Sequence, residues 1–169
     1  MTAARTHTRQ RSRLTHIAPD GSVRMVDVGS KPPTQRHATA EASVRLSAAA
    51  LRALAAGTIA KGDALTTAQI AGISAAKRTS ELIPLCHPLQ LSHVDVALKI
   101  IPPRTVQIQC SAACVGSTGV EMEALTGAAV AALTLYDMCK AVDRSATIAN
   151  LQLIEKHGGK SGVFKRRRG

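Results

Sequence analysis

Alternating apolar and polar residues predict four strands along the chain. In residues 36–46 every second residue from Ala38 to Leu46 is apolar, which is the period of a strand with one buried face. The same alternation recurs in residues 94–98 and 106–112, and residues 148–155 are expected to form a fourth strand with Leu151 and Leu153 on one face. Pro102-Pro103 lies between the second and third of these stretches, so we expect a turn that joins two antiparallel strands.

Three segments carry helical spacing. Ser47 can cap a helix that Gly57 ends, and a second helix is expected from about 67 to 81, with Pro84 as its limit. The longest spans residues 120–142. The resulting order predicts an α+β fold, a ferredoxin-like antiparallel sheet with helices on one face and one extra helix in the first crossover. The other face would need cover, for which a partner subunit is a candidate.

Most of the charge lies at the two ends of the chain. The formal net charge is +11; residues 1–24 and 165–168 carry +4 each, so +3 remains for residues 25–164. We therefore expect a basic, flexible arm over 1–24, a single catalytic domain over 25–164, and a basic tail over 165–169. An RNA- or DNA-binding module is the rival class. Nucleic acid is nevertheless not expected as a partner, because one Tyr and one Phe offer too few surfaces for stacking bases.

The four cysteines have no C-x-x-C spacing, and neither a signal-peptide core nor an apolar run of membrane-spanning length accompanies them. Reduced thiols in a cytoplasmic protein without membrane segments are therefore expected. Cys110 and Cys114 are an even number of residues apart on a predicted strand, so they should share a face. Two cysteines alone do not make a zinc site, and we expect no metal.

Cys86 and His87 lie between Pro84 and Pro88, which keep this segment from being ordinary helix. A thiol and an imidazole on a stiff backbone shortly after Lys77 indicate a site that handles an anion. The simpler alternative is a buried thiol beside a hydrogen-bonded histidine. A cysteine-protease partner could not be recognised from spacing.

Two pairs of charged residues mark the long helix. Asp137 and Lys140 share a face and are either a surface ion pair or a proton-transfer pair. Glu121 and Glu123 suit the positive end of the helix dipole, but they could also accept hydrogen bonds from a guanine-like edge. Glu123 and Asp137 are roughly 21 Å apart along a continuous helix. They must serve different ends of a long ligand, or sites completed by different subunits.

Glycine-rich residues 158–162 resemble the end of a phosphate-binding P-loop. Ile154 stands where that motif needs glycine, so a P-loop is excluded, although glycine amides and lysines can still hold phosphates. A flexible loop is the alternative. Lys61-Gly62-Asp63 is likewise either a plain turn or part of a polar site.

Several segments in the same order, together spanning about residues 14–164, closely resemble the MoaC family of cyclic pyranopterin monophosphate synthases. They are Met25–Val28, Lys61–Asp63, Ile70–Ile73, Ala75–Thr79, Leu82–Leu89, Thr118–Thr126, Leu135–Val142 and Gly158–Gly162.

The resemblance implies a lyase of molybdenum cofactor biosynthesis. Such an enzyme converts 3′,8-cyclo-7,8-dihydroguanosine 5′-triphosphate to cyclic pyranopterin monophosphate and releases pyrophosphate. The implied catalytic residues are Asp137, Lys140 and Lys61. The implied substrate-binding residues, to which neighbouring Glu121 is added, are Leu85, Cys86, His87, Met122, Glu123, Lys77, Arg36, Lys156 and, less directly matched, Lys160.

The family further implies a homohexamer, a trimer of dimers with active sites between subunits. No cofactor is indicated; Mg²⁺ bound with the triphosphate is compatible with the sequence but not indicated by it. Ser117 stands where relatives often carry a basic residue, and Gly127 replaces a better helix former at a cost of about 1 kcal/mol at most. A catalytically dead relative is not expected, because the chain retains four residues of the implied site: Lys61, His87, Asp137 and Lys140.

Overall fold

The computed structural model describes residues 20–167, so most of the arm expected over 1–24 and the last two residues of the expected tail lie outside the described residues. Its elements are β1 (Thr34–Arg45), α1 (Ala48–Ala55), α2 (Ala64–Ala76), α3 (Thr79–Leu82), β2 (Leu91–Ile101), β3 (Thr105–Gly116), α4 (Glu121–Cys139), β4 (Thr147–His157) and β5 (Phe164–Lys165).

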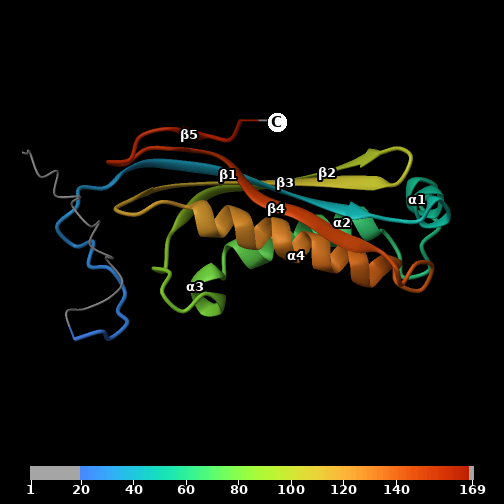
Figure 1. Ribbon diagram of the computed structural model, residues 1–169, viewed down its shortest axis with the longest axis horizontal. Coiled ribbons are helices and arrows are strands. Elements are labelled where there is room, and N and C mark those ends of the chain that lie inside the picture. The colour runs from blue at the N-terminus through green and yellow to red at the C-terminus, as the bar shows by residue number, and fades with distance from the viewer. Residues whose placement is uncertain (1–19, 168–169) are drawn as a thin grey trace, which may run out of the picture.

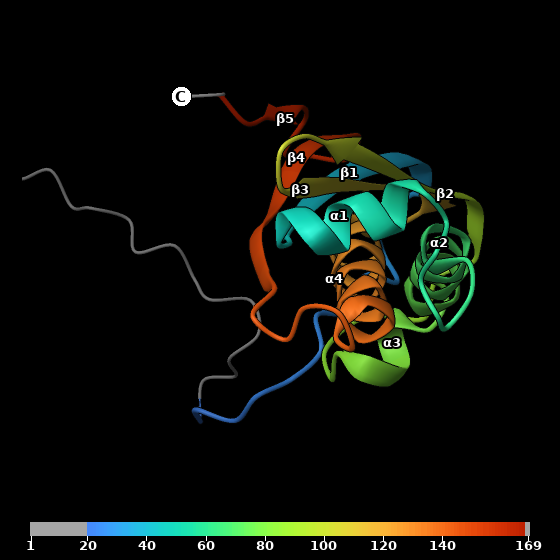
Figure 2. The ribbon, with the colours of Figure 1, turned by 90° about the vertical axis from the view of Figure 1, so that its right-hand side faces the viewer.

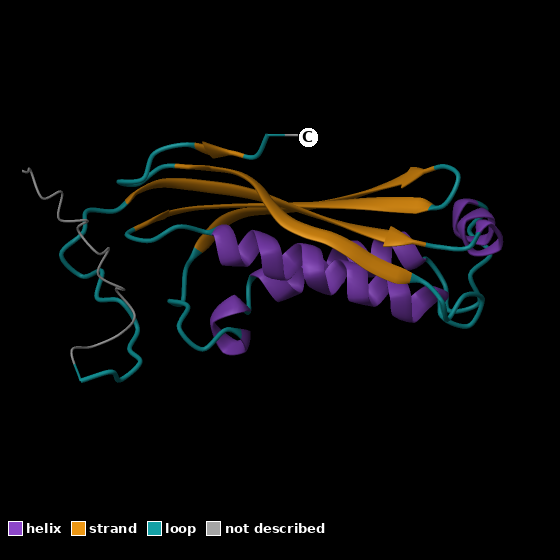
Figure 3. Ribbon diagram, viewed as in Figure 1, coloured by secondary structure: helices purple, strands orange, loops and turns teal. Residues whose placement is uncertain are grey.

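The strands form one antiparallel sheet in the order β2-β3-β1-β4-β5. Helices α2 and α4 lie side by side against one face, with α1 at one end of the sheet (Figures 1 and 2). No helix of the described chain covers the other face (Figure 3). The predicted α+β class and antiparallel sheet are confirmed. None of the described helices is long and apolar enough to cross a membrane.

Small residues of the central strand β1 form the middle of the core. The alternate residues from Ala38 to Val44 are buried against the helices, while Thr39, Glu41 and Ser43 between them face the open side of the sheet. Cys110 and Cys114 of β3 are also buried, so the prediction that they share a face is confirmed. All four cysteines are free. Pro102-Pro103 lies between β2 and β3, as predicted.

Side-chain caps set where the first two helices begin. Ser47 accepts a hydrogen bond from the Ala50 N–H at 3.2 Å, which confirms the predicted cap of α1. Asp63 caps α2 by accepting bonds from the N–H and the hydroxyl of Thr66 at 3.0 and 2.6 Å. Helix α2 therefore begins at Ala64, a few residues before the predicted start, because Asp63 caps it.

The single helix predicted over about 67–81 is wrong at its C-terminal end as well. The Arg78 N–H bonds the Ala75 carbonyl at 3.0 Å, a tightened turn that ends α2 at Ala76. The chain then forms the separate short helix α3. The break turns the segment that follows α3 across the N-terminal end of α4.

Glycine allows α2 and α4 to approach closely. A Cβ on Gly127 of α4 would lie 2.5 Å from the Cys110 sulfur, and one on Gly72 of α2 would lie 2.9 Å from the Gly127 carbonyl oxygen. The Gly127 carbonyl belongs to the helix backbone, and the Cys110 side chain is completely buried, so neither atom has free space to move into. The sequence predicts only a cost in helix propensity at Gly127. The structure shows that the close packing of α2 against α4 requires glycine at this position.

The chain adds a short fifth strand that the alternation pattern did not predict. Phe164 and Lys165 pair with Lys156 and Glu155 of β4, and the Arg166 N–H bonds the Ile154 carbonyl at 2.7 Å. Two residues are too few for a period to be visible. The beginning of the expected basic tail is thus attached to the edge of the sheet.

Candidate active site

Two adjoining cavities open at the N-terminal end of α4. The first, of about 310 Å³, contains the carboxylates of this helix end and is called the acid cavity. The second, of about 630 Å³, is called the basic cavity because lysines and an arginine line it. Both are lined by Lys31, Thr118, Gly119 and Glu121, so they form one continuous cleft.

The acid cavity unites two segments predicted to bind substrate. Leu85, Cys86 and His87 lie opposite Met122 and Glu123 at the start of α4. The break between α2 and α3 makes this possible, because it lets the chain leave the helix pair and cross the end of α4.

His87 is held by the N-terminal segment. Its Nε2 lies 2.8 Å from the carbonyl oxygen of Val26. A carbonyl can only accept, so Nε2 must carry a hydrogen and donate it. In the neutral ring Nδ1 then keeps its lone pair, and this atom can accept a proton or a hydrogen bond from a ligand.

Burial controls the protonation of the two acidic groups in this cavity. Glu123 is only 4% exposed, and burial raises its pKa above the usual range, with a further contribution from the Glu121 carboxylate. Burial also raises the pKa of the Cys86 thiol, and the negative charge of Glu123 adds to this. Cys86 is therefore a thiol at neutral pH and a poor nucleophile, which disfavours cysteine-protease chemistry.

Glu123→Gln is expected to make the protein more stable at neutral pH, by on the order of 1 kcal/mol, because the ionised carboxylate loses hydration on burial. The pKa of Glu123 is higher in the folded than in the unfolded protein. Below the unfolded-state pKa the carboxyl is protonated in both states, so it costs the wild type no stability. The loss of stability develops as the pH rises and is complete above the folded-state pKa. The difference in thermal midpoint should shrink as the pH falls toward 4. Glu121→Gln is the matched control and should bring no gain in stability, since that carboxylate is more exposed, at 31%, and faces Lys156. A wild type more stable than Glu123→Gln at pH 7 would contradict the assignment.

The basic cavity brings together Arg36 of β1 with Lys156 and Lys160 around the glycine-rich loop after β4. The Lys156 Nζ lies 3.7 Å from Glu121 Oε1 and donates to the Ser161 hydroxyl. These cations and the loop amides can neutralise a polyanion.

Backbone shape places the Arg36 side chain. Its Nε donates to the Gly116 carbonyl at 3.1 Å, and its guanidinium lies directly over Gly159. A Cβ on Gly159 would lie 1.6 Å from Arg36 Nη1, and the residue has a φ of +75°. The glycine-rich loop is therefore shaped around the arginine.

Asp137, Lys61 and Lys140 form a third group at the opposite end of α4. The Asp137 carboxylate receives Lys61 at 2.7 Å and Lys140 at 2.5 Å, and Lys61 also donates to the Asp137 carbonyl at 3.0 Å. Hydrogen bonds from Lys140 and then Lys61 lower the pKa of Asp137 to about 2. The carboxylate is thus ionised at neutral pH and holds two ammonium groups at one exposed point.

The structure brings together the residues within each group but does not unite the groups within one chain. Glu123 and Asp137 are roughly 21 Å apart along the continuous helix, as the sequence predicted. Lys77 caps the end of α2 and is exposed, and it lines neither the acid nor the basic cavity.

Lys31 was not among the site residues predicted from the sequence, yet it lines both cavities. Its carbonyl accepts a hydrogen bond from the Ser117 hydroxyl at 2.8 Å. A signal was present, because Lys31 directly precedes Pro32-Pro33 and so joins a cation to a stiff backbone, as the Cys86 segment does. The described residues also offer one group of three side chains suited to a metal ion, His37, Glu155 and His157. It lies outside this cleft.

Comparison with known proteins identifies the family of this chain. The MoaC family model matches residues 25–159. A cyclic pyranopterin monophosphate synthase of Roseiflexus sp. (strain RS-1) is 55% identical over 154 residues, covering 90% of this chain and 98% of the relative. The proteins of that name from Desulfitobacterium hafniense and, as synthase 1, from Mycobacterium tuberculosis are 52% and 54% identical over 153 residues; each alignment covers 90% of this chain, and 94% and 90% of the respective relative. The chain belongs to the MoaC family.

Proposed function

We propose that this protein converts 3′,8-cyclo-7,8-dihydroguanosine 5′-triphosphate to cyclic pyranopterin monophosphate with release of pyrophosphate, as a lyase of molybdenum cofactor biosynthesis. The observation that carries the proposal is the cleft itself, in which a buried acid and a Cys-His segment adjoin a cationic, glycine-rich pocket. The names of its relatives support the same reaction.

The two cavities suit the two ends of such a substrate. Glu123, Cys86 and His87 would hold the purine-derived ring, since a carboxylate accepts hydrogen bonds from the N–H groups of a guanine edge. Arg36, Lys156 and Lys160 would hold the triphosphate, with Lys31 at the junction.

Asp137, Lys61 and Lys140 are proposed to perform the proton transfers. The Asp137 carboxylate, with its pKa of about 2, is a weak base at neutral pH, so its part is to hold the two ammonium groups toward the reacting atoms. The distance along α4 supports delivery of this group to the cleft of another subunit. A homohexamer built as a trimer of dimers would satisfy this requirement.

Finer assignments complete the proposal. The strand order β2-β3-β1-β4 supports a ferredoxin-like plan for a catalytic domain over residues 25–164. Its first crossover, between β1 and β2, holds the three helices α1, α2 and α3, because the single helix expected over about 67–81 is divided in two. Lys77 would reach substrate only from its exposed position at the end of α2. We propose action in the cytoplasm with no resident cofactor, any Mg²⁺ arriving with the triphosphate.

The test is to incubate the purified full chain with the cyclised dihydro-GTP derivative and to follow pyrophosphate release together with pterin formation. Both products should appear in equal amounts. Pyrophosphate without pterin would reveal a mere triphosphate hydrolase, and neither product from a folded protein would refute the proposal.

A further inference from the structure

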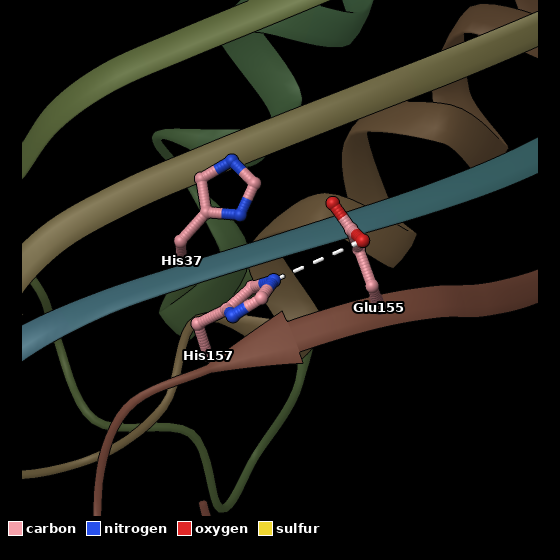
Figure 4. Close-up of side chains that lie close together, drawn as sticks. All are labelled: His37, Glu155 and His157. Carbon is pink, nitrogen blue, oxygen red and sulfur yellow. Dashed lines mark ion pairs between the residues drawn. The ribbon is translucent and has the colours of Figure 1, made fainter. Parts of the chain in front are cut away.

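A group of potential metal ligands lies on the open face of the sheet, on the side away from the helices. His37 of β1 and His157 of β4 are direct partners in the antiparallel pairing, and Glu155 is two residues before His157 on the same strand (Figure 4). Their ligand atoms, one from each side chain, all lie within 4.8 Å of one another. The two imidazole centres are 6.0 Å apart.

These side chains are otherwise uncommitted. The His157 Nε2 lies 3.8 Å from Glu155 Oε2, which is too long for a hydrogen bond. Within residues 20–167 none of the three side chains makes a hydrogen bond. Two imidazoles and one carboxylate therefore lie close together with lone pairs that can bind a metal ion.

We propose that His37, Glu155 and His157 bind a divalent transition-metal ion, with Zn²⁺ as the preferred ion. Two histidines and one glutamate are a zinc ligand set in which water completes the coordination. Tetrahedral zinc places its ligand atoms roughly 3.3 Å apart, so the group must close by modest side-chain rotation. His157 is about half exposed, which gives it room to rotate.

The surroundings are polar and open. His37 and Glu155 line a cavity of about 630 Å³, whose wall includes the hydrogen-bonded hydroxyls of Thr39 and Ser111. Lys165 and Arg166 line it too, and their positive charge opposes a cation. Arg166 Nε is engaged with the Leu153 carbonyl at 2.8 Å, so the guanidinium is held at the strand edge. Because of these two positive charges, the expected affinity for Zn²⁺ is moderate.

The alternation of the strands places this site back to back with the basic cavity. Arg36 precedes His37, and Lys156 lies between Glu155 and His157; both cations point to the opposite side of the sheet. A metal that joins β1 to β4 would therefore stabilise the pair of strands that presents Arg36 and Lys156 to a polyanion.

The test begins with the full chain stripped of metal by a chelator, then titrated with Zn²⁺ against a chromogenic competitor and with Co²⁺ by visible absorption. We expect one ion per chain, bands of nitrogen and oxygen ligation, and a thermal midpoint that rises with Zn²⁺. His37→Gln and His157→Gln should each weaken binding at least about 10-fold and abolish the rise. His93→Gln, an exposed histidine of β2, should change nothing.

Circular dichroism of the metal-free variants checks that they fold. Unchanged Zn²⁺ affinity in the His37→Gln/His157→Gln double variant would overturn the proposal. An intense thiolate charge-transfer band with Co²⁺ would do so as well, because it would place the ion on a cysteine. Turnover does not enter this test, so its result is independent of the proposed reaction.

Discussion

Asp137→Asn should lower turnover by about 10²–10⁴-fold while leaving the protein folded and able to bind substrate. The neutral amide cannot compensate two ammonium groups that the carboxylate now holds at 2.7 and 2.5 Å. Because Asp137 is half exposed and roughly 21 Å along α4 from Glu123, its loss should affect kcat far more than the affinity of the cleft. Steady-state kinetics and substrate binding to the inactive variant measure these two effects separately.

Glu81→Gln is the matched control for Asp137→Asn. It breaks another exposed i, i+3 ion pair, between Glu81 and Arg78 at 2.9 Å, without touching the proposed catalytic group. Turnover by Glu81→Gln should stay close to wild type. Near wild-type turnover by Asp137→Asn would remove Asp137 from the mechanism.

Mixing of subunits then tests where Asp137 acts. Asp137→Asn carries an intact cleft, and Arg36→Ala carries an intact Asp137 group. If sites form between subunits, co-expression should restore part of the activity, because some sites combine the two intact halves. No recovery in mixed oligomers would mean that each chain works alone.

Gly159→Ala should raise KM by about 10-fold or more with a smaller effect on kcat. The new Cβ would lie 1.6 Å from Arg36 Nη1, so the guanidinium must leave its place beside the basic cavity. Loss of one charge-assisted contact to a phosphate accounts for this magnitude. Substrate saturation curves for the variant measure it.

Gly162→Ala separates this displacement from backbone strain. Gly162 has a comparable positive φ of +63°, but a Cβ there meets no atom within 4 Å. Both variants pay on the order of 1 kcal/mol for a left-handed alanine, whereas only Gly159→Ala moves Arg36. In an Arg36→Ala background Gly159→Ala should add little. Equal KM values for the two glycine variants would show that strain alone is responsible.

Local patterns determined most of the elements. The alternation in β1 and the Ser47 cap were readable because a strand has period 2 and a cap needs only one side chain at one position. The separation of Glu123 from Asp137 also followed from sequence, since helix rise is constant. The resemblance of ordered segments then identified the family, which no single motif could do.

Only the tertiary structure decided what depends on contacts between distant segments. The two-residue strand β5 exists because β4 offers an unpaired edge, and Gly127 is required because α2 lies against it. Lys31 lines the cleft because of where its loop lies. His37 lies beside Glu155 and His157 because of the register between β1 and β4. Such positions carry no local signal, since register and packing are set by the whole sheet.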